Sequence, residues 1–321
     1  MMINNDVIEA ILNSKNIGIS FHTSPDGDAL GSALALMLAL KKIGKNTYIV
    51  SRDEVPEIYR FLPYYECASK MIEKVQDDTD TVLILDCGNV ARISGEVNFD
   101  NNSYKVINVD HHLSNDMYGA LNYVDCKAAA VGEIVFDVIN QLNITIDKDI
   151  AVCLYTALLT DTGGFKHSNT TIKTHSIAGE LINLEIDFSE IHRKLFENKK
   201  LERVKLYSKI IDSMELYNNN KLCVMGITKD LLNSVGISEA SDTSDIISIG
   251  MEIDTVEVAI LVKETDAGTK ISLRSKDKVD VRKIAETFGG GGHTKAAGLS
   301  IDKSYSEAKS MIINSVKGEL H

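Results

Sequence analysis

The alternation of short apolar runs with helix-like segments in the first half of the chain constrains the fold most. The runs that have the length and the Val and Ile content of buried strands are residues 17–21, 47–50, 81–85 and 105–109. Helical patterns cover residues 29–40, 131–142 and 148–159. Short buried strands that alternate with helices predict an α/β fold, with a doubly wound domain around a mainly parallel sheet.

The second half predicts a smaller α/β domain behind a linker. A chain of 321 residues is expected to form two separate cores. Residues 188–214 are charged and helical, and we interpret them as a linker between a first domain at 1–187 and a second at 215–321. The second domain holds strand candidates at 221–227, 256–263 and 270–275 and helix candidates at 281–287 and 305–316.

Charge and composition narrow the functional class. A net charge of −12 argues against a protein that coats long nucleic acid, because such binding needs many Lys and Arg side chains. It is compatible with a small phosphorylated substrate, since bound cations invert the field of an aspartate-rich site. The sequence has no bilayer-length apolar run, no signal-peptide core and no CxxC pair among its five cysteines. We therefore expect a cytoplasmic protein without a membrane partner.

Acidic and histidine side chains follow the predicted strands at the points where the strands end. They are His22, Asp26 and Asp28 after the first strand, Asp86 after residues 81–85, and Asp110, His111 and His112 after residues 105–109. Asp161 follows the predicted helix at 148–159. Because the carboxyl ends of parallel strands meet at one edge of a sheet, we expect these side chains to converge there.

Such a cluster points to bound metal ions. Carboxylates packed together repel one another unless cations lie among them. Imidazole mixed with carboxylate suits first-row ions such as Mn²⁺ better than Ca²⁺. The candidate ligands suffice for two ions, and a pair about 3.5–4 Å apart suits phosphoryl transfer. We therefore predict a phosphoesterase with two divalent ions, Mn²⁺ being expected and Mg²⁺ or Co²⁺ the alternatives.

Most of these residues also have a simpler structural explanation. Asp26 and Asp28 fit a turn and the N-cap of a helix from Ala29 about as well as they fit metal ligands, and Asp28 is expected to be cap and ligand together. A lone Asp after a strand, such as Asp86, is more typical of a turn. Adjacent histidines at 111 and 112 have no such structural need. The joint placement therefore indicates a metal site more strongly than any single motif does.

A run of four glycines near the C-terminus is the other informative segment. Residues 289–292 are all glycine and precede His293, so their exposed N–H groups can cradle a phosphate, although a hinge or tight turn is the alternative. Residues 263–295 hold eight Lys and Arg against five Asp and Glu. Arg274, near a predicted strand end, can bind a terminal phosphate with two N–H donors.

Five segments resemble the successive motifs of one known family, the DHH/DHHA1 phosphoesterases. These are HTSPDGDALGS, LILDCGNVAR, NVDHH, LLTDTGGF and FGGGGHTKAAG, which extend from His22 almost to Ile301. In length the chain most resembles the NrnA-type oligoribonucleases, which often also act as phosphatases of 3′-phosphoadenosine 5′-phosphate (pAp). The resemblance implies short RNA oligonucleotides or dinucleotides, and pAp, as substrates, and a homodimer. A phosphodiesterase of cyclic di-AMP or pApA is the alternative within the family.

The resemblance also implies roles for individual residues. One ion would be bound by His22, Asp26 and Asp86, and the second by Asp28, Asp86, His111 and Asp161. His112 would face the scissile phosphate, Asp110 would orient the histidines, and Arg92 would contact the substrate. In the second domain the implied substrate-binding residues are Arg274, Gly290, Gly291, Gly292 and His293, with His293 as a further catalytic candidate. Cys87 stands where many members have threonine, and it is not an implied ligand.

Three functions outside this interpretation remain open at the level of sequence. A manganese-dependent inorganic pyrophosphatase shares the first set of motifs but should lack the GGGGH segment. An exonuclease of long single strands needs additional nucleic-acid-binding domains. A catalytically inactive nucleotide-binding module would usually have lost metal ligands, and here every expected ligand is present. The cleavage direction and the identity of the general acid, His112 or His293, stay open.

Overall fold

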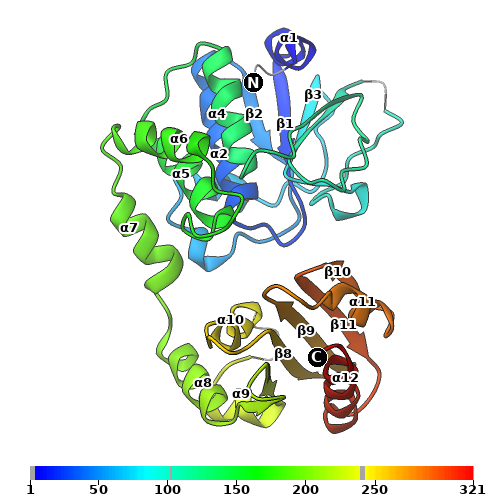
Figure 1. Ribbon diagram of the computed structural model, residues 1–321. Helices are drawn as coiled ribbons and strands as arrows, with labels where there is room; N and C mark the ends of the chain where they lie inside the picture. Colours follow the sequence, from blue (N-terminus) through cyan, green and yellow to red (C-terminus); the bar gives the residue numbers. More distant parts are fainter. Residues whose placement is uncertain (1–3, 102, 239–242, 321) are drawn as a thin grey trace. The chain divides into compact units, whose positions relative to one another are not determined.

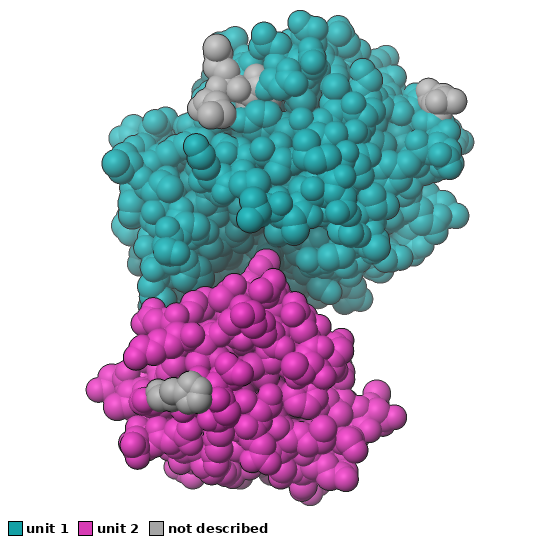
Figure 2. Space-filling view, turned by 45° about the vertical axis from the view of Figure 1, so that its right-hand side comes forward, with its two compact units in different colours: residues 1–198 teal, residues 199–321 magenta. Residues whose placement is uncertain are grey.

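The computed structural model describes residues 4–101, 103–238 and 243–320, which fold as two compact units. Unit 1 is Met1–Asn198 and unit 2 is Lys199–His321 (Figure 2). The predicted linker at 188–214 spans this boundary: α7 (Phe188–His192) lies in unit 1, and α8 (Leu201–Asp212) lies in unit 2. Among the described residues, no helix is long and apolar enough to cross a membrane.

Unit 1 is built around a parallel sheet with the strand order β2-β1-β3-β4-β5. Its strands are β1 (Asn16–Ser20), β2 (Asn46–Ile49), β3 (Thr81–Leu85), β4 (Lys105–Asp110) and β5 (Leu121–Val124). The parallel pairing confirms the predicted α/β fold class. The chain adds β2 on one side of β1 and β3 on the other, so the strand order reverses between β1 and β3. Ligands of open α/β sheets bind at the carboxyl ends of strands beside such a reversal.

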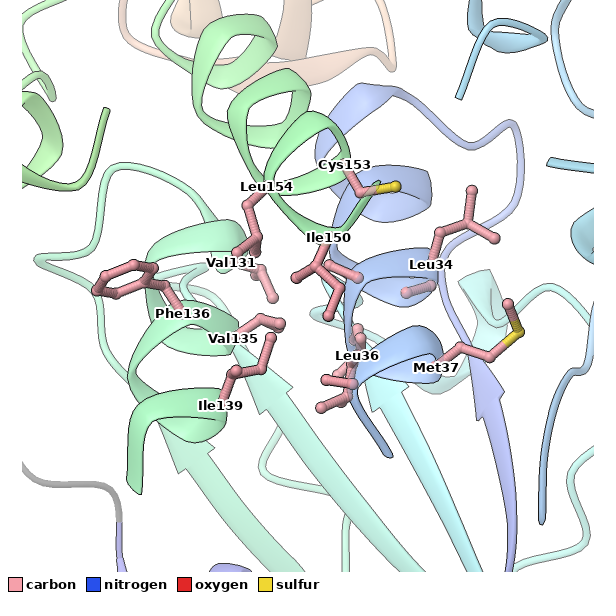
Figure 3. Packing of buried hydrophobic residues seen from close by; sticks show 14 of the residues in the cluster. Leu34, Leu36, Met37, Val131, Val135, Phe136, Ile139, Ile150, Cys153 and Leu154 are labelled. Atoms are coloured by element: carbon pink, nitrogen blue, oxygen red, sulfur yellow. The ribbon is translucent and has the colours of Figure 1, made fainter. Parts of the chain in front are cut away.

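Helices bury one face of this sheet (Figure 1). They include α1 (Asn5–Asn13), α2 (Gly27–Lys42), the short α3 (Tyr65–Ala68), α4 (Val131–Gln141), α5 (Lys148–Asp161) and α6 (Ile172–Ile182). Leu34 of α2, Val135 of α4 and Leu154 of α5 belong to one core, shown in Figure 3. The opposite face packs against connecting segments. Ile93 and Tyr104 of these segments belong to a separate cluster of buried hydrophobic residues on that face.

Close contact between α2 and α5 depends on a residue without a side chain. A Cβ atom at Gly31 would lie 2.5 Å from the backbone oxygen of Cys153, closer than such atoms approach in proteins. The absence of this Cβ lets the two helices pack tightly, and α2 and α5 carry two of the candidate metal ligands, Asp28 and Asp161. Helix packing thereby sets the separation of these two carboxylates.

Unit 2 contains a mixed sheet with the order β10-β11-β9-β8-β7-β6. The strands are β6 (Glu215–Tyr217), β7 (Leu222–Ile227), β8 (Val258–Thr265), β9 (Gly268–Ser275), β10 (Gly291–His293) and β11 (Ala296–Ile301). The helices that follow α8 are α9 (Lys229–Val235), α10 (Ile247–Met251), α11 (Val281–Glu286) and α12 (Tyr305–Glu319). The glycine run, expected as a loop, is partly strand, because Gly291 and Gly292 pair with β11 at the sheet edge.

The two faces of this sheet differ in how far helices cover them. On one face, Ile260 and Leu273 pack with α11 and α12. On the other, Met225 of β7 and Ala259 of β8 pack with residues of α8 and α10. Arg274 of β9 pairs with Ala259 and with Ala296 of β11, which in turn pairs with His293 of β10. Directly paired residues project to the same face of a sheet, so this row continues the second face toward its edge.

Candidate functional site

The carboxyl edge of the parallel sheet brings the predicted ligands of unit 1 together. His22 follows β1, Asp86 follows β3 and His111 follows β4. The residues whose ligand atoms lie within 4.8 Å of one another form three overlapping groups: His22, Asp26 and Asp86; Asp28, His111 and Asp161; and Asp86, Asp110, His111 and His112. Each group contains enough donors to hold a metal ion.

The first group surrounds Nε2 of His22. This atom lies 3.7 Å from Oδ1 of Asp26 and 3.5 Å from Oδ2 of Asp86. Nδ1 of His22 lies 2.9 Å from the backbone oxygen of Thr23 and can donate to it, which leaves Nε2 directed at the carboxylates. Two donor atoms that each bind one ion at about 2.1 Å are about 3 Å apart or slightly more. The spacing of this group is therefore close to that of a coordination shell.

The second group surrounds Nε2 of His111. This atom lies 3.4 Å from Oδ2 of Asp161 and 3.6 Å from Oδ1 of Asp86. Nδ1 of His111 is 3.1 Å from the backbone oxygen of Ala128, which again leaves Nε2 free to act as a ligand. Asp86 thus turns Oδ2 toward His22 and Oδ1 toward His111. One carboxylate between two groups of donors can be shared by a pair of ions.

The electrostatics of the cluster favour bound cations. Burial, together with the charges of Asp86 and Asp26, raises the pKa of Asp28 well above its usual value. Burial and the neighbouring carboxylates raise the pKa of Asp161 to about 8. Burial lowers the pKa of His22, but hydrogen bonds to Asp26 and Asp86 outweigh it and raise the pKa to about 11. Protons and divalent ions therefore compete for the same oxygens and nitrogens, so the donor set fits metal ions.

The N-cap of α2 is not Asp28, the residue expected from the sequence. The helix begins at Gly27, so Asp26 is the N-cap, and its Oδ1 accepts from the N–H groups of Asp28 and Ala29 at 3.1 Å each. The prediction that Asp28 is the cap is therefore wrong, because the helical turn already includes that residue. The buried carboxylate of Asp28 instead accepts from the backbone N–H groups of Val131 at 2.6 Å and Gly132 at 2.9 Å. The start of α4 thereby orients Asp28.

Asp110 acts on the histidines through hydrogen bonds. It is fully buried, and its Oδ1 lies 2.8 Å from Nδ1 of His112 and accepts from the N–H of His111 at the same distance. The hydrogen bond to Asp110 raises the pKa of His112, although burial opposes the shift. Asn115, which the sequence analysis did not single out, donates to Oδ2 of Asp110. Asp110 therefore holds His112 with Nε2 pointing away from the carboxylate.

Left-handed backbone occurs beside the candidate ligands. Ser24, Asp86 and Phe165 have φ angles of 55°, 53° and 65°. Ser24 lies between His22 and Asp26, and Phe165 follows the loop that begins after Asp161. A non-glycine residue in this region costs of order 1–3 kcal/mol and persists where surrounding contacts hold it, typically at functional sites.

Arg92 lies beside the first group of ligands through the backbone. It ends the 3-10 turn Val90–Arg92, and its backbone oxygen accepts from the N–H of Thr23 at 2.6 Å. The side chain is exposed. The turn that carries Arg92 is thus attached directly to the loop that follows His22.

The substrate-binding candidates of unit 2 lie in or beside the β9-β11-β10 part of its sheet. Arg274 and His293 belong to the same row, with only the methyl group of Ala296 between them. Burial lowers the pKa of Arg274, so an anion beside the guanidinium would be favourable. Gly290 and Gly292 are required sterically, because a Cβ at either would lie 2.4–2.5 Å from a backbone oxygen of β11, whereas Gly291 is unobstructed.

Matches to known proteins cover both halves of the chain. The DHH family, N-terminal domain, matches residues 16–158, and the DHHA1 domain matches residues 228–320. The bifunctional oligoribonuclease and PAP phosphatase NrnA of Thermus thermophilus is 32% identical over 309 residues, 95% of this chain and 90% of the relative. The protein of the same name from Bacillus subtilis is 30% identical over 292 residues, 87% of each.

A solved structure extends the likeness to three dimensions. The exopolyphosphatase-related protein from Bacteroides fragilis superposes with a TM-score of 0.85 at 26% identity and covers 98% of this chain and 97% of that one. Together with the two matching domains and the relatives at 30–32% identity, this likeness confirms the family resemblance found in the motifs. The chain belongs to the DHH family and carries a DHHA1 domain after its DHH domain.

Proposed function

We propose that the chain is a two-metal phosphoesterase that hydrolyses short oligoribonucleotides, including dinucleotides, to mononucleotides and also converts pAp to AMP. The observation that carries the proposal is the position of Asp86, whose two oxygens face His22 and His111 in separate groups of donors. The names of the relatives from Thermus thermophilus and Bacillus subtilis support the substrate class.

The proposed metal ligands divide between two positions that share Asp86. His22, Asp26 and Asp86 would hold one ion, and Asp28, Asp86, His111 and Asp161 the other, with Mn²⁺ as the proposed metal because the donors mix imidazole and carboxylate. When bound, two divalent ions supply a water activated for attack and neutralise charge on the phosphoryl oxygens. The residues themselves keep the donors at the spacing that such a pair needs.

His112 is the proposed proton donor to the leaving oxygen. Asp110 raises its pKa, which favours the ring form that also carries a proton at Nε2, and the side chain is partly exposed. A protonated imidazole can both stabilise the phosphoryl oxygens and release its proton as the phosphorus–oxygen bond breaks. We propose His112 rather than His293 as the general acid because His112 lies beside the candidate metal ligands.

The proposed role of unit 2 is to bind the part of the substrate that does not react. Arg274 offers a half-buried guanidinium and His293 an exposed imidazole on one row of the sheet. A guanidinium in such a place binds phosphate oxygens through charge-assisted hydrogen bonds. Arg92, exposed beside the His22 loop, is proposed to contact the substrate from unit 1.

The test is Mn²⁺-dependent hydrolysis of a substrate panel. The panel contains pApA, a pentaribonucleotide, a long RNA, pAp, cyclic di-AMP and pyrophosphate. We expect turnover of pApA, the pentaribonucleotide and pAp, and little turnover of the long RNA. Turnover of pyrophosphate alone would favour a pyrophosphatase, and preference for cyclic di-AMP would favour the alternative phosphodiesterase. No turnover of any substrate by metal-loaded protein would contradict the proposal.

A further inference from the structure

Two polar residues outside the motifs are hydrogen-bonded to the segments that carry the two groups of donors. We infer that Asp53 is a positioning residue for the ion at His22 and Asp26, and that Asn169 is a positioning residue for the ion at Asp28, His111 and Asp161. The inference rests on the proposed function only in assuming two ions. It adds that a different residue positions the ligands of each ion, so that the affinity for either ion can be lowered alone.

Asp53 connects the loop of the first ion to Ser94, which lies two residues after the turn that carries Arg92. Its Oδ1 accepts from the backbone N–H of Ser24 at 3.2 Å, and its Oδ2 accepts from the hydroxyl of Ser94 at 2.5 Å. Ser94 is fully buried, and its Oγ lies 2.9 Å from Oγ of Ser51. Asp53 is therefore held in place by a buried hydroxyl while it reaches the exposed loop.

The hydrogen bond to Asp53 is made by the residue of this loop that has a left-handed backbone conformation. Ser24 has a φ of 55° and lies two residues from both His22 and Asp26. Without the Asp53 carboxylate, the N–H of Ser24 loses its acceptor and the loop is free to leave the left-handed conformation. The imidazole of His22 and the carboxylate of Asp26 would then no longer converge. Loss of Asp53 should therefore lower the affinity for the first ion.

Asn169 connects the two helices of the second ion. Its Nδ2 donates to the backbone oxygen of Ala129 at 3.0 Å and to that of Asp161 at 3.2 Å. Ala129 immediately precedes the N-cap of α4, and Asp161 is the last residue of α5. One side-chain amide thus joins the start of one helix to the end of the other.

The segment that Asn169 anchors contacts the remaining members of the second group. The backbone oxygen of Ala128 lies 3.1 Å from Nδ1 of His111. The N–H groups of Val131 and Gly132 donate to Asp28. Residues 128–132 therefore orient two ligands by direct contact, and Asn169 ties the third, Asp161, to the same segment. Loss of Asn169 should lower the affinity for the second ion and leave the affinity for the first ion unchanged.

The test measures Mn²⁺ binding in backgrounds where only one ion remains. His22→Ala removes a ligand of the first ion, and Asp161→Ala removes a ligand of the second. Into each background we would introduce Asp53→Ala or Asn169→Ala and titrate metal-free protein with Mn²⁺ by calorimetry. Electron paramagnetic resonance of the single variants would report whether the spin-coupled pair of ions survives.

A crossed pattern is expected. In the His22→Ala background, Asn169→Ala should weaken Mn²⁺ binding about 10- to 100-fold, while Asp53→Ala should change it less than about twofold. In the Asp161→Ala background, Asp53→Ala should weaken Mn²⁺ binding about 10- to 100-fold, while Asn169→Ala should change it less than about twofold. Equal weakening in both backgrounds, or no weakening in either, would overturn the inference. Wild-type protein that binds fewer than two ions would overturn the proposed function, and this inference with it.

Conservative variants separate positioning from folding. Asp53→Asn keeps an oxygen acceptor for Ser24 and should restore part of the affinity that Asp53→Ala loses. Asn169→Asp keeps the size but cannot donate, so it should bind Mn²⁺ as weakly as Asn169→Ala. The exposed neighbours Glu54 and Ser168 supply matched controls as Glu54→Gln and Ser168→Ala. If Asp53→Ala or Asn169→Ala fails to fold, the Asn and Asp variants decide the outcome.

Discussion

At the scale of single residues, the chemistry of the site depends on carboxylates that act through their neighbours. Asp110 is fully buried and bonded to Nδ1 of His112, so it sets both the orientation and the pKa of that ring. Asp28 is held in a similar way, because the backbone N–H groups of Val131 and Gly132 donate to its carboxylate. Buried carboxylates of this kind need partners at every oxygen.

Replacement of Asp110 should therefore shift the pH profile of kcat. The proposed role of His112 needs its protonated form, so activity should fall as pH rises through the pKa of His112. Asp110→Asn removes the charge that raises this pKa, and the fall should move to lower pH. His112→Ala should reduce kcat about 10²- to 10⁴-fold with both Mn²⁺ ions still bound. A pH profile of kcat that is identical in Asp110→Asn and wild type would contradict the assignment.

Metal binding should release protons near neutral pH. Without ions, His22 has a pKa of about 11 and Asp161 one of about 8, so both carry protons at pH 7. Binding should release at least two protons per protein at that pH, and affinity should rise with pH as fewer protons are displaced. Calorimetry in two buffers of different ionisation enthalpy measures this number. Binding without proton release would mean that these groups are not ligands.

At the scale of secondary-structure elements, the packing of α2 on α5 sets the distance between Asp28 and Asp161, two candidate ligands of the second group. Gly31→Ala should disturb it, because the added methyl group meets the backbone oxygen of Cys153. We expect a loss of about 1–3 kcal/mol in the free energy of unfolding, measured by denaturant titration. Gly179→Ala in α6 is the matched control, since a Cβ there meets nothing within 4 Å. Equal stability of the two variants would contradict the packing argument.

The elements that the sequence predicted best are those buried on both faces. Strand β3 carries a continuous run of Val, Leu and Ile, and β4 is buried along its length after Lys105 although Asn108 interrupts its apolar run. The predicted bounds of both strands agree with the structure to within one residue. Strand β5 (Leu121–Val124) was missed because all its residues are half-buried and an Asn interrupts the apolar pattern. The glycine run gave no sign that it pairs as an edge strand, because glycine has no strand preference of its own.

The positions of the ligands followed from the same pattern, because a parallel sheet gathers residues that follow its strands. Their division into two groups came only from the family resemblance. Asp53 and Asn169 could not be found this way, since each is a single polar residue in a loop. The partners of Asp53 are 29 and 41 residues away, and those of Asn169 are 40 and 8 residues away, so only the folded chain brings each set together.

At the scale of the whole molecule, the two units have separate cores and separate sets of candidate residues. Every proposed metal ligand lies in unit 1, whereas Arg274 and His293 lie in unit 2. Residues 1–198 expressed alone should therefore bind two Mn²⁺ ions but turn over short oligonucleotides poorly. Calorimetry and hydrolysis assays on this fragment test the division. A folded fragment that binds no Mn²⁺, or that cleaves pApA as well as the full chain, would contradict it.

The most direct test of the account is the number of Mn²⁺ ions bound by Asp86→Ala, compared with wild type and with the exposed control Asp77→Ala. Because Asp86 faces both groups of donors, its loss should abolish the spin-coupled Mn²⁺ pair and reduce kcat on pApA by about 10³-fold or more. Asp77→Ala should behave as wild type. Two coupled ions and near-normal turnover in Asp86→Ala would contradict the shared carboxylate, and with it the two-metal site.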